Sequence, residues 1–568
     1  MPRPTYSLGL DFGTSSARAL IVDTWTGRAA GSGSSPFQHG ADGILGDPKD
    51  PNVARQHPSD WLTAMAAAVE QATQAARRLD PDFAAERIVG IGIDATASTP
   101  LPVDSHCAPL VNEPRFADDL DAHAWLWKDH SAHAEAEEIT QRARAEHPEY
   151  LDRCGGSYSS EWYFSKLLRC LRKSPHVMRE ADGWIEEGDW IAGVLTGADS
   201  PRDLPRNACA AGHKAMYSDS WGFPSIDFLS RVDPALGNWC RGRLPAKAYA
   251  ADTVAGALCD GWAEKLGLVE GTPVAVAAID AHVGAVGAGI RPGVLVKILG
   301  TSGCDMLVHP LSSPIGKIPG ICGVAEGSIL PGHFGLEAGQ SALGDIFAWF
   351  VREFASAAGL THEALSIEAA RLRPGESGLL ALDWNNGNRS VLADPRLTGL
   401  LVGQTLQTRP AEVYRALLEA SAFGARIIVE RFEEHQVPVK EVVACGGIAE
   451  KSPLLLQIYA DVTGRAIGVS RSQETCALGA AVFGAVVGKA WRSVDEAERA
   501  MTGVKAIVYR PNPDAERVYA ELFGLYRKLH DAFGVNGTTI SLSSVMKRLI
   551  EIREKSVGGP CGRQSLVS

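Results

Sequence analysis

The sequence predicts an α/β fold built from two related domains, and three observations support this prediction. Short apolar runs alternate with longer alanine-rich stretches, which is typical of strands that alternate with helices. The chain has 568 residues, more than a single hydrophobic core usually serves. One strand–turn–strand pattern also occurs twice, roughly half a chain apart. Together these features favour two domains of similar topology.

The repeated pattern is a Gly-Thr-Ser turn between two apolar strands. Its first copy spans residues 8–23 and its second spans residues 298–308. These three residue types are common in turns, so a single copy would carry little weight. Two copies in the same context indicate related domains, with a boundary near residues 289–293, where turn residues cluster. We therefore expect an N-terminal domain over residues 1–289, a C-terminal domain over residues 290–545 and a loose tail over residues 546–568.

Other elements can be predicted in order along the chain. Apolar residues at helical spacing predict a helix over residues 61–79, and an apolar run predicts a buried strand over 88–94. In the C-terminal half, a strand over 442–445 precedes a helix that begins at residue 452 or 453, where serine and proline favour a helix start. The small residues of 476–488 predict a helix that packs closely against a sheet.

Composition and charge argue against several classes of protein. Lys and Arg number 55 against 67 Asp and Glu, and the net charge of −12 comes without a dense basic stripe, so no nucleic-acid partner is expected. The 11 cysteines are scattered singly, which favours reduced thiols over a disulfide framework or a zinc site. The longest apolar stretch, residues 272–290, contains Asp280 and His282, so no membrane span is expected. Without a signal-peptide pattern, we expect a cytoplasmic protein.

Three glycine-rich turns at strand ends form the pattern that a nucleotide site needs. Glycine lacks a Cβ, so backbone N–H groups can approach phosphate oxygens, and Thr and Ser hydroxyls add donors. Asp11, beside the first turn, would be a poor phosphate contact by itself. It fits this position if it holds Mg²⁺, either directly or through a water molecule. The chain has no GxxxxGK[ST] motif, which excludes a Walker-type fold.

Two sets of segments occur in order along the chain. In Asp11–Thr14, Gly300–Ser302 and Gly446-Gly447 the chain resembles the actin, hexokinase and Hsp70 superfamily. In Gly92–Thr99, Leu126–His130, Ala210–Lys214, Asp280–Gly289 and Gly335–Ala342 it resembles the FGGY carbohydrate kinases of that superfamily, and among them the ribulokinase branch. The resemblance implies two ribonuclease-H-like domains that flank a cleft for ATP and a sugar, with the sugar and phosphate side in the N-terminal domain and the nucleotide side in the C-terminal domain.

The resemblance also implies roles for individual residues. Asp280 lies where the family has its catalytic base, and it would accept the proton of a sugar hydroxyl as that oxygen attacks the γ-phosphate of ATP. A carboxylate at the end of an apolar strand is also costly to bury without a purpose. The implied sugar-binding positions are Ala97, Trp127, Asp129, Lys214, Asp280 and Glu337. The implied nucleotide-binding positions are Gly13, Thr14, Ser15, Gly300, Thr301, Gly344, Gly446, Gly447 and Lys451.

The implied reaction is phosphorylation of L-ribulose to L-ribulose 5-phosphate in arabinose catabolism, with ATP and Mg²⁺. Because a few hydrogen bonds read hydroxyl stereochemistry, D-ribulose, D-xylulose and ribitol remain alternatives. A non-catalytic sugar sensor would have no need of Asp11 or Asp280, and an Hsp70-like ATPase would have no need of the sugar-side segments. Glu337 could instead cap a helix that begins near Ala338. No membrane partner is expected, and a homodimer is considered.

Overall fold

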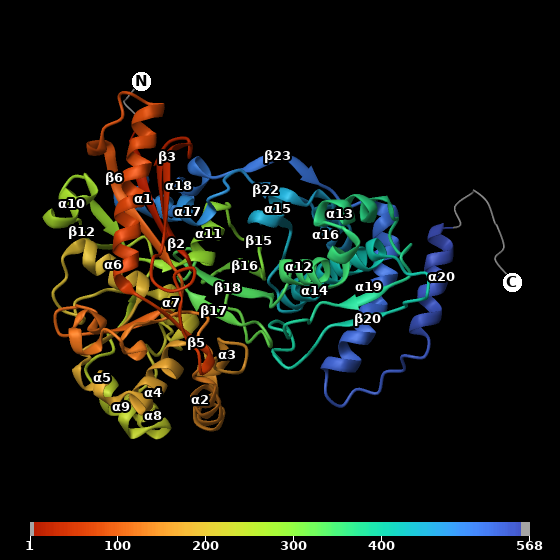
Figure 1. Cartoon of the computed structure of the whole chain (residues 1–568), viewed down its shortest axis with the longest axis horizontal. Helices are drawn as coiled ribbons and strands as arrows, with labels where there is room; N and C mark the ends of the chain where they lie inside the picture. Colours follow the sequence, from red (N-terminus) through yellow and green to blue (C-terminus); the bar gives the residue numbers. More distant parts are fainter. Residues whose placement is uncertain (1–4, 558–568) are drawn as a thin grey trace.

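The computed structural model describes residues 5–557 and shows two α/β halves side by side (Figure 1). The N-terminal half contains a 7-stranded sheet in the order β12-β13-β6-β1-β2-β3, with β14 also paired to β6. The central strand β1 is antiparallel to β2 and parallel to β6. The strands of this sheet are β1 Tyr6–Phe12, β2 Ser16–Asp23, β3 Ala29–Pro36, β6 Ile88–Ala95, β12 Val254–Ala257, β13 Pro273–Ala275 and β14 Ala278–Ile279.

The C-terminal half contains a second 7-stranded sheet, in the order β17-β18-β16-β15-β21-β22-β23. Its central strand β15 is antiparallel to β16 and parallel to β21. The strands are β15 Val294–Leu299, β16 Gly303–Pro310, β17 Gly323–Glu326, β18 His333–Gln340, β21 Glu441–Cys445, β22 Ile467–Ser470 and β23 Val504–Tyr509. Smaller strands are β4 Leu45–Asp47, β5 Asp50–Gln56, β7 Pro100–Val103, β8 Ala124–Trp125, β9 Gly183–Glu186, β10 Arg206–Asn207, β11 Ala248–Tyr249, β19 Leu380–Leu382 and β20 Leu400–Val402.

The two sheets share one plan, as the repeated turn predicts. In each, the first strand forms a hairpin with the next strand and pairs in parallel with a later one. The two hairpin turns close through similar backbone hydrogen bonds: Gly13 N donates to Ser16 O at 3.0 Å, and Gly300 N donates to Ser302 O at 3.0 Å. The predicted α/β fold with two related halves is therefore confirmed.

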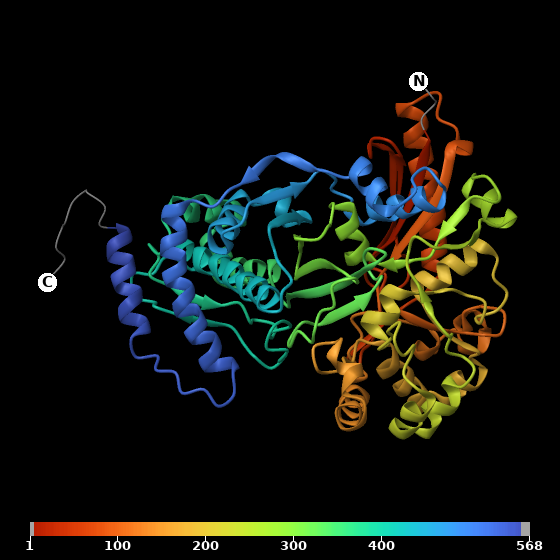
Figure 2. The ribbon, with the colours of Figure 1, turned by 180° about the vertical axis from the view of Figure 1, so that it is seen from behind.

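Helices cover both sheets (Figures 1 and 2). In the N-terminal half, α1 packs on β2 and β3. The N-terminal helices are α1 Pro58–Leu79, α2 His133–Glu146, α3 Pro148–Asp152, α4 Tyr163–Lys173, α5 Pro175–Glu180, α6 Glu187–Thr196, α7 Ala208–Lys214, α8 Ile226–Val232, α9 Pro234–Cys240, α10 Asp260–Leu266 and α11 Asp280–Gly287. The C-terminal helices are α12 Gly344–Phe350, α13 His362–Arg371, α14 Pro410–Glu434, α15 Gly447–Lys451, α16 Pro453–Thr463, α17 Thr475–Val487, α18 Val494–Met501, α19 Pro513–Gly534 and α20 Val545–Val557.

Helix α17 joins the two halves. It comes from the C-terminal half, yet it packs against β1 and β6 of the first sheet and against α11. The approach is close enough to require glycine, since a Cβ on Gly9 would lie 1.9 Å from the carbonyl oxygen of Ala477. A Cβ on Gly92 would lie 1.8 Å from that of Ala480. The predicted close packing of this helix on a sheet is confirmed, and the sheet is that of the N-terminal half.

The end of the chain differs from the prediction of a loose tail that begins at residue 546. Residues 545–557 form α20, which lies beside α19 (Figure 2). Val545, Leu549 and Ile552 are buried, and their spacing places them on one face of the helix. Burial of this apolar face explains why the segment is ordered. Residues 558–568 of the predicted tail lie outside the described residues.

Between residues 5 and 557, the structure has no helix that is both long enough and apolar enough to cross a membrane. The 10 cysteines in this part are all free thiols.

Candidate active site

Three carboxylates meet at the edge of the first sheet where β1, β6 and β14 end. Asp11 on β1 pairs in register with Asp94 on β6, and Asp94 pairs with Ala278 on β14. Strand β14 leads directly into Asp280, the first residue of α11. The Oδ1 atom of Asp280 accepts a hydrogen bond from the backbone N–H of Ala281 at 2.7 Å. Because these strands run in parallel, their carboxyl ends bring the acidic side chains to one place.

The electrostatics of this cluster favour proton uptake by Asp280. Burial raises its pKa to about 7, and the negative charge of Asp11 contributes to the rise. Burial, followed by the charges of Asp11 and Asp280, also raises the pKa of Asp94 well above its usual value. Asp11 is paired instead with Arg18, whose Nη1 lies 3.0 Å from Oδ2. A carboxyl group with a pKa near neutrality is suited to act as a general base.

The same cluster offers a set of oxygen donors for a metal ion. Both carboxylate oxygens of Asp94 are buried beside Asp11, and no group other than Asp11 in the described part of the chain offers them a hydrogen bond. Ligand atoms of Asp11, Asp94 and Cys476 all lie within 4.8 Å of one another. Buried carboxylates are costly unless they are paired, and carboxylate oxygens are preferred ligands of hard divalent cations. The two aspartates therefore fit such a cation. Asp94 was not predicted as a site residue, although it ends a predicted buried strand.

Lys214 and Glu337 form a buried ion pair near this cluster. Lys214 Nζ lies 3.3 Å from Glu337 Oε2. Lys214 is the last residue of α7, a helix capped by Asn207, whose Oδ1 accepts from Ala210 N at 2.6 Å. Glu337 lies within β18, so it does not cap a helix, and the alternative interpretation of this residue is wrong. Burial by itself would raise the pKa of Glu337, but Lys214 and two nearby histidines lower it, so the carboxylate stays charged.

The loop that contains Ala97 is held by buried side chains that the sequence reading did not identify. Glu186 accepts a hydrogen bond from Ser98 Oγ at 2.5 Å and another from Thr99 N at 2.8 Å. Lys166 Nζ donates to the carbonyl oxygen of Ser98 at 2.7 Å and to that of Leu126 at 2.8 Å. These contacts fix the backbone around Ala97, at the end of β6.

Trp127 contacts the first hairpin turn, whereas the carboxylate of Asp129 is enclosed inside the N-terminal half. Trp127 Nε1 donates to Thr14 Oγ1 at 3.0 Å, which ties the first hairpin turn to the Trp127 segment. Asp129 is fully buried; its carboxylate accepts from Ala54 N at 2.8 Å and from Ser131 Oγ at 2.6 Å, and it forms an ion pair with Arg55. A carboxylate enclosed in this way supports the neighbouring chain. This differs from the prediction that Asp129 contacts a sugar.

The predicted nucleotide-binding positions fall into two groups. Gly13, Thr14 and Ser15 form the turn between β1 and β2. On the C-terminal side, Gly344 N donates to Gly300 O at 3.1 Å, and Leu343 N donates to Thr301 O at 2.8 Å. Gly446 follows β21 with a φ of +90°, and Gly447 and Lys451 are the first and last residues of α15. Gly446 lies against Leu299, since a Cβ there would be 2.6 Å from the Leu299 carbonyl oxygen.

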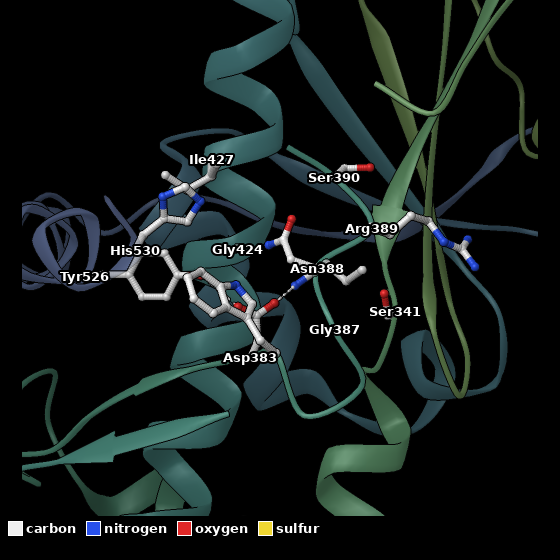
Figure 3. Close-up of a pocket in the computed structure, with 12 residues that line it drawn as sticks. Ser341, Asp383, Gly387, Asn388, Arg389, Ser390, Gly424, Ile427, Tyr526 and His530 are labelled. Atoms are coloured by element: carbon white, nitrogen blue, oxygen red, sulfur yellow. Dashed lines mark hydrogen bonds between the residues drawn. The ribbon is translucent and has the colours of Figure 1, made fainter. Parts of the chain in front are cut away.

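A small pocket lies in the C-terminal half, between the end of β18 and the helices α14 and α19 (Figure 3). In it, Asp383 accepts hydrogen bonds from Gln340 Nε2 and from the hydroxyl of Tyr526, each at 2.7 Å. Arg389 points away from Asp383 (Figure 3). Burial acts to lower the pKa of Arg389, but nearby groups that include Glu161 and Glu337 raise it above its usual value. Arg389 therefore places a positive charge near Glu337. This charge was not predicted from the sequence.

Two family models match the chain. The N-terminal domain of the FGGY family of carbohydrate kinases matches residues 6–287, and the C-terminal domain of the same family matches residues 295–487. The chain belongs to the FGGY family of carbohydrate kinases. A ribulokinase of Shouchella clausii is 41% identical over 98% of this chain and 99% of its own length. A ribulokinase of Geobacillus thermodenitrificans is 42% identical over 97% of each chain.

Solved structures of this family show a similar fold. A ligand-bound xylulose kinase from Lactobacillus acidophilus has a TM-score of 0.76 at 20% identity, covering 94% of this chain and 99% of that one. A glycerol kinase from Plasmodium falciparum with ADP has a TM-score of 0.73 at 15% identity, covering 94% and 98%. The predicted two-domain fold of the actin and hexokinase type is therefore confirmed for this FGGY kinase.

Proposed function

We propose that this FGGY kinase transfers the γ-phosphoryl group of ATP to L-ribulose and forms L-ribulose 5-phosphate. The observation that carries the proposal is the position of Asp280, a carboxyl group whose pKa is raised to about 7 beside Asp11. The relatives at about 40% identity over nearly their full length are named ribulokinase, which supports this sugar. The product would enter arabinose catabolism.

In this proposal, Asp280 accepts the proton of the sugar hydroxyl while that oxygen attacks the γ-phosphorus in line. Lys214 and Glu337 hold other oxygens of the sugar, and the backbone at Ala97 forms one wall of its site. Most of the acceleration comes from positioning and from groups that stabilise negative charge. The loss of a general base typically costs about 10²–10⁴ in rate.

The nucleotide is proposed to lie between the two hairpin turns. Backbone N–H groups of Gly13, Thr14 and Ser15 would face the phosphates from the N-terminal side, and Gly300 and Thr301 from the C-terminal side. The turn at Gly446 and Gly447, with Gly344 and Lys451, would lie near the adenosine. Asp11 and Asp94 would hold Mg²⁺, which when bound neutralises part of the phosphate charge.

The division of the chain follows from the same proposal. Residues 1–289 would carry the sugar and phosphate side, and residues 290–545 the nucleotide side. Closure of the two halves would exclude water, so that the sugar hydroxyl rather than water receives the phosphoryl group.

Another pentulose or pentitol remains the second candidate, because a few hydrogen bonds read hydroxyl stereochemistry. Two solved neighbours are described as xylulose kinases, but their identity to this chain is 20% and 23%, so they support the fold and not the choice of sugar. A sensor without catalysis would not need a base, and the raised pKa of Asp280 therefore disfavours it.

The test is sugar-dependent release of ADP from MgATP, with L-ribulose, D-ribulose, D-xylulose, ribitol, L-arabinose and glycerol as acceptors. A preference for L-ribulose in kcat/KM is expected. A preference for a different acceptor would keep the kinase and change the sugar. If none of the acceptors stimulated ADP release, the proposal would be wrong.

A further inference from the structure

A cluster of metal-binding side chains lies against the ion pair of Lys214 and Glu337. Ligand atoms of Cys209, His213 and His282 all lie within 4.8 Å of one another, and all three side chains are buried. Cys209 and His213 are four residues apart on α7, so they share one face of that helix. His282 comes from α11, and its ring centroid is 4.4 Å from that of His213.

Glu337 lies beside the two histidines of this cluster. Its Oε2 atom lies 3.7 Å from His213 Nδ1 and 3.6 Å from His282 Nε2. These distances are too long for good hydrogen bonds but fall near the separation of two ligands on one ion. One sulfur, two imidazole nitrogens and one carboxylate oxygen form a donor set that Zn²⁺ prefers. The mixed set argues against Mg²⁺, which takes oxygen ligands.

The hydrogen bond between His213 and Ser328 leaves the Nδ1 lone pair of His213 on the side of Glu337. Ser328 Oγ donates to the carbonyl oxygen of Ala325 at 3.1 Å, so it accepts from His213 Nε2 at 3.0 Å. The Nδ1 atom of His213 is then unprotonated, and it has no hydrogen-bond partner. Both ring nitrogens of His282, a side chain only 1% exposed, also lack a partner. Buried polar atoms without partners are rare, and one cation would bind the unprotonated nitrogen of each ring.

We propose that Cys209, His213, His282 and Glu337 bind one thiophilic divalent cation such as Zn²⁺, and that its occupation blocks the sugar site. Binding would replace the proton of the Cys209 thiol, which passes to solvent, with a metal–sulfur bond. The ammonium of Lys214, at 3.3 Å, would have to leave Glu337 because two cations repel each other there. The blocking effect rests on the proposed sugar role of Lys214 and Glu337, whereas binding of the metal does not.

Two charged groups, Glu337 and Lys214, determine the affinity of the site for a cation. The negative charge of Glu337 would offset part of the charge of the ion, while the ammonium of Lys214 opposes it. Lys214 therefore limits the affinity, and its removal should strengthen metal binding. Misfolding would separate the ligands and weaken zinc binding, so it cannot explain a gain in affinity.

The test uses the reduced full chain, stripped of metal by a chelator and dialysed against ZnCl₂ alone. One tightly bound zinc per chain is expected. Cys209→Ser and His282→Gln should each weaken binding by about 10-fold or more, which is what even outer-sphere changes cost at metal sites. Lys214→Met should bind zinc more tightly than the unchanged chain. Cys259→Ser, a change of a half-buried cysteine before α10, is the matched control and should bind normally.

Two further measurements separate the parts of the proposal. Co²⁺ in place of Zn²⁺ should give a sulfur-to-cobalt absorption band that disappears in Cys209→Ser and remains in Cys259→Ser. Calorimetry with L-ribulose in the absence of ATP should show weaker sugar binding when zinc is present. Zinc binding that is unchanged by both Cys209→Ser and His282→Gln would overturn the site. Undiminished ribulose binding to the zinc-loaded chain would overturn the blocking effect. Zinc binding can be measured by dialysis even if the chain phosphorylates no sugar, so failure of the proposed function would not be mistaken for failure of the metal site.

Discussion

Lys214 and Glu337 form a buried ion pair between the two halves of the molecule, with 3.3 Å between Nζ and Oε2 and both side chains 11% exposed. One partner ends α7 of the N-terminal half, and the other lies within β18 of the C-terminal half. Removal of one partner from such a pair leaves an unpaired buried charge. The pair therefore couples the proposed sugar site to the contact between the halves.

The change Glu337→Gln tests the sugar role of this pair. A hydrogen bond to a charged group contributes about 1.5–3 kcal/mol, which corresponds to a rise in the KM for ribulose of about 10–150-fold. The kcat value should change less than KM, because the carboxylate does not contact the reacting atoms. Steady-state kinetics measures both. Glu363→Gln, on the exposed start of α13, is the control, and an unchanged KM in Glu337→Gln would contradict the assignment.

The change Asp280→Asn tests the general base. The amide is similar in shape but cannot accept the hydroxyl proton, so kcat should fall by about 10²–10⁴. Sugar binding, measured by calorimetry, should be retained. Asp227→Asn, at an exposed position on α8, should keep normal turnover. Near-normal turnover in Asp280→Asn would remove this residue from its role.

The pH dependence of the reaction follows from the same residue. Burial, with a contribution from Asp11, raises the pKa of Asp280 to about 7, and only the ionised form can accept a proton. Below this pH the carboxyl group is protonated and the rate should fall, while above it the rate should level off. A profile of kcat/KM between pH 5 and pH 9 checks this. The residual activity of Asp280→Asn should lack this step; if the step persists, another group is responsible.

The loop at Ala97 can be tested through Ser98→Ala. This change removes the hydrogen bond from Ser98 Oγ to Glu186, which is 2.5 Å long and buried. Ser98 is a positioning residue, so the KM for the sugar should rise more than kcat falls. Ser98→Thr keeps the hydroxyl and should restore most of the KM. Equal behaviour of the alanine and threonine variants would show that the hydroxyl does not position the loop.

Glu498 provides a test of stability that is remote from the active site. Burial, and then the charge of Asp495, raises its pKa to about 9, and its Oε1 atom has no partner. In the unfolded chain a glutamate titrates near 4.3, so between these values the folded state binds the extra proton. The free energy of unfolding should therefore fall as pH rises from about 4 toward 9.

The change Glu498→Gln removes this pH dependence. The variant should have a higher Tm than the unchanged chain at pH 8, and the difference should shrink toward pH 5. Thermal unfolding at the two pH values measures this. Glu363→Gln again serves as a control, with no pH-dependent difference expected. A lower Tm of Glu498→Gln at pH 8 would contradict the raised pKa.

Much of the site could be predicted from the sequence because its backbone parts are local. The turns at Gly13 and Gly300 and the strand that leads to Asp280 are short patterns of residue type and order. The structure confirms the turns, the strands and the helices at these positions. The family matches confirm the predicted kinase fold.

Other parts could not be predicted, because they depend on contacts between distant segments. Asp94 becomes a site residue because β1 and β6 pair in register beside Asp11. Asp129 was predicted to contact a sugar, but its carboxylate is buried in an ion pair with Arg55, which lies 74 residues away along the chain. Likewise, Cys209 and His213 lie far along the chain from His282 and Glu337, so no sequence motif predicts that these four side chains come together.

The sequence by itself therefore determined the fold class, the family and the turns that we propose to face a nucleotide, because these follow from periodicity and from short motifs. Only the tertiary structure decided which charges are buried together and which polar atoms have partners. The pKa of Asp280 and the charge of Glu337 depend on desolvation and on neighbours from other elements. Burial and proximity are properties of the packed chain, and they decide the chemistry of each side chain.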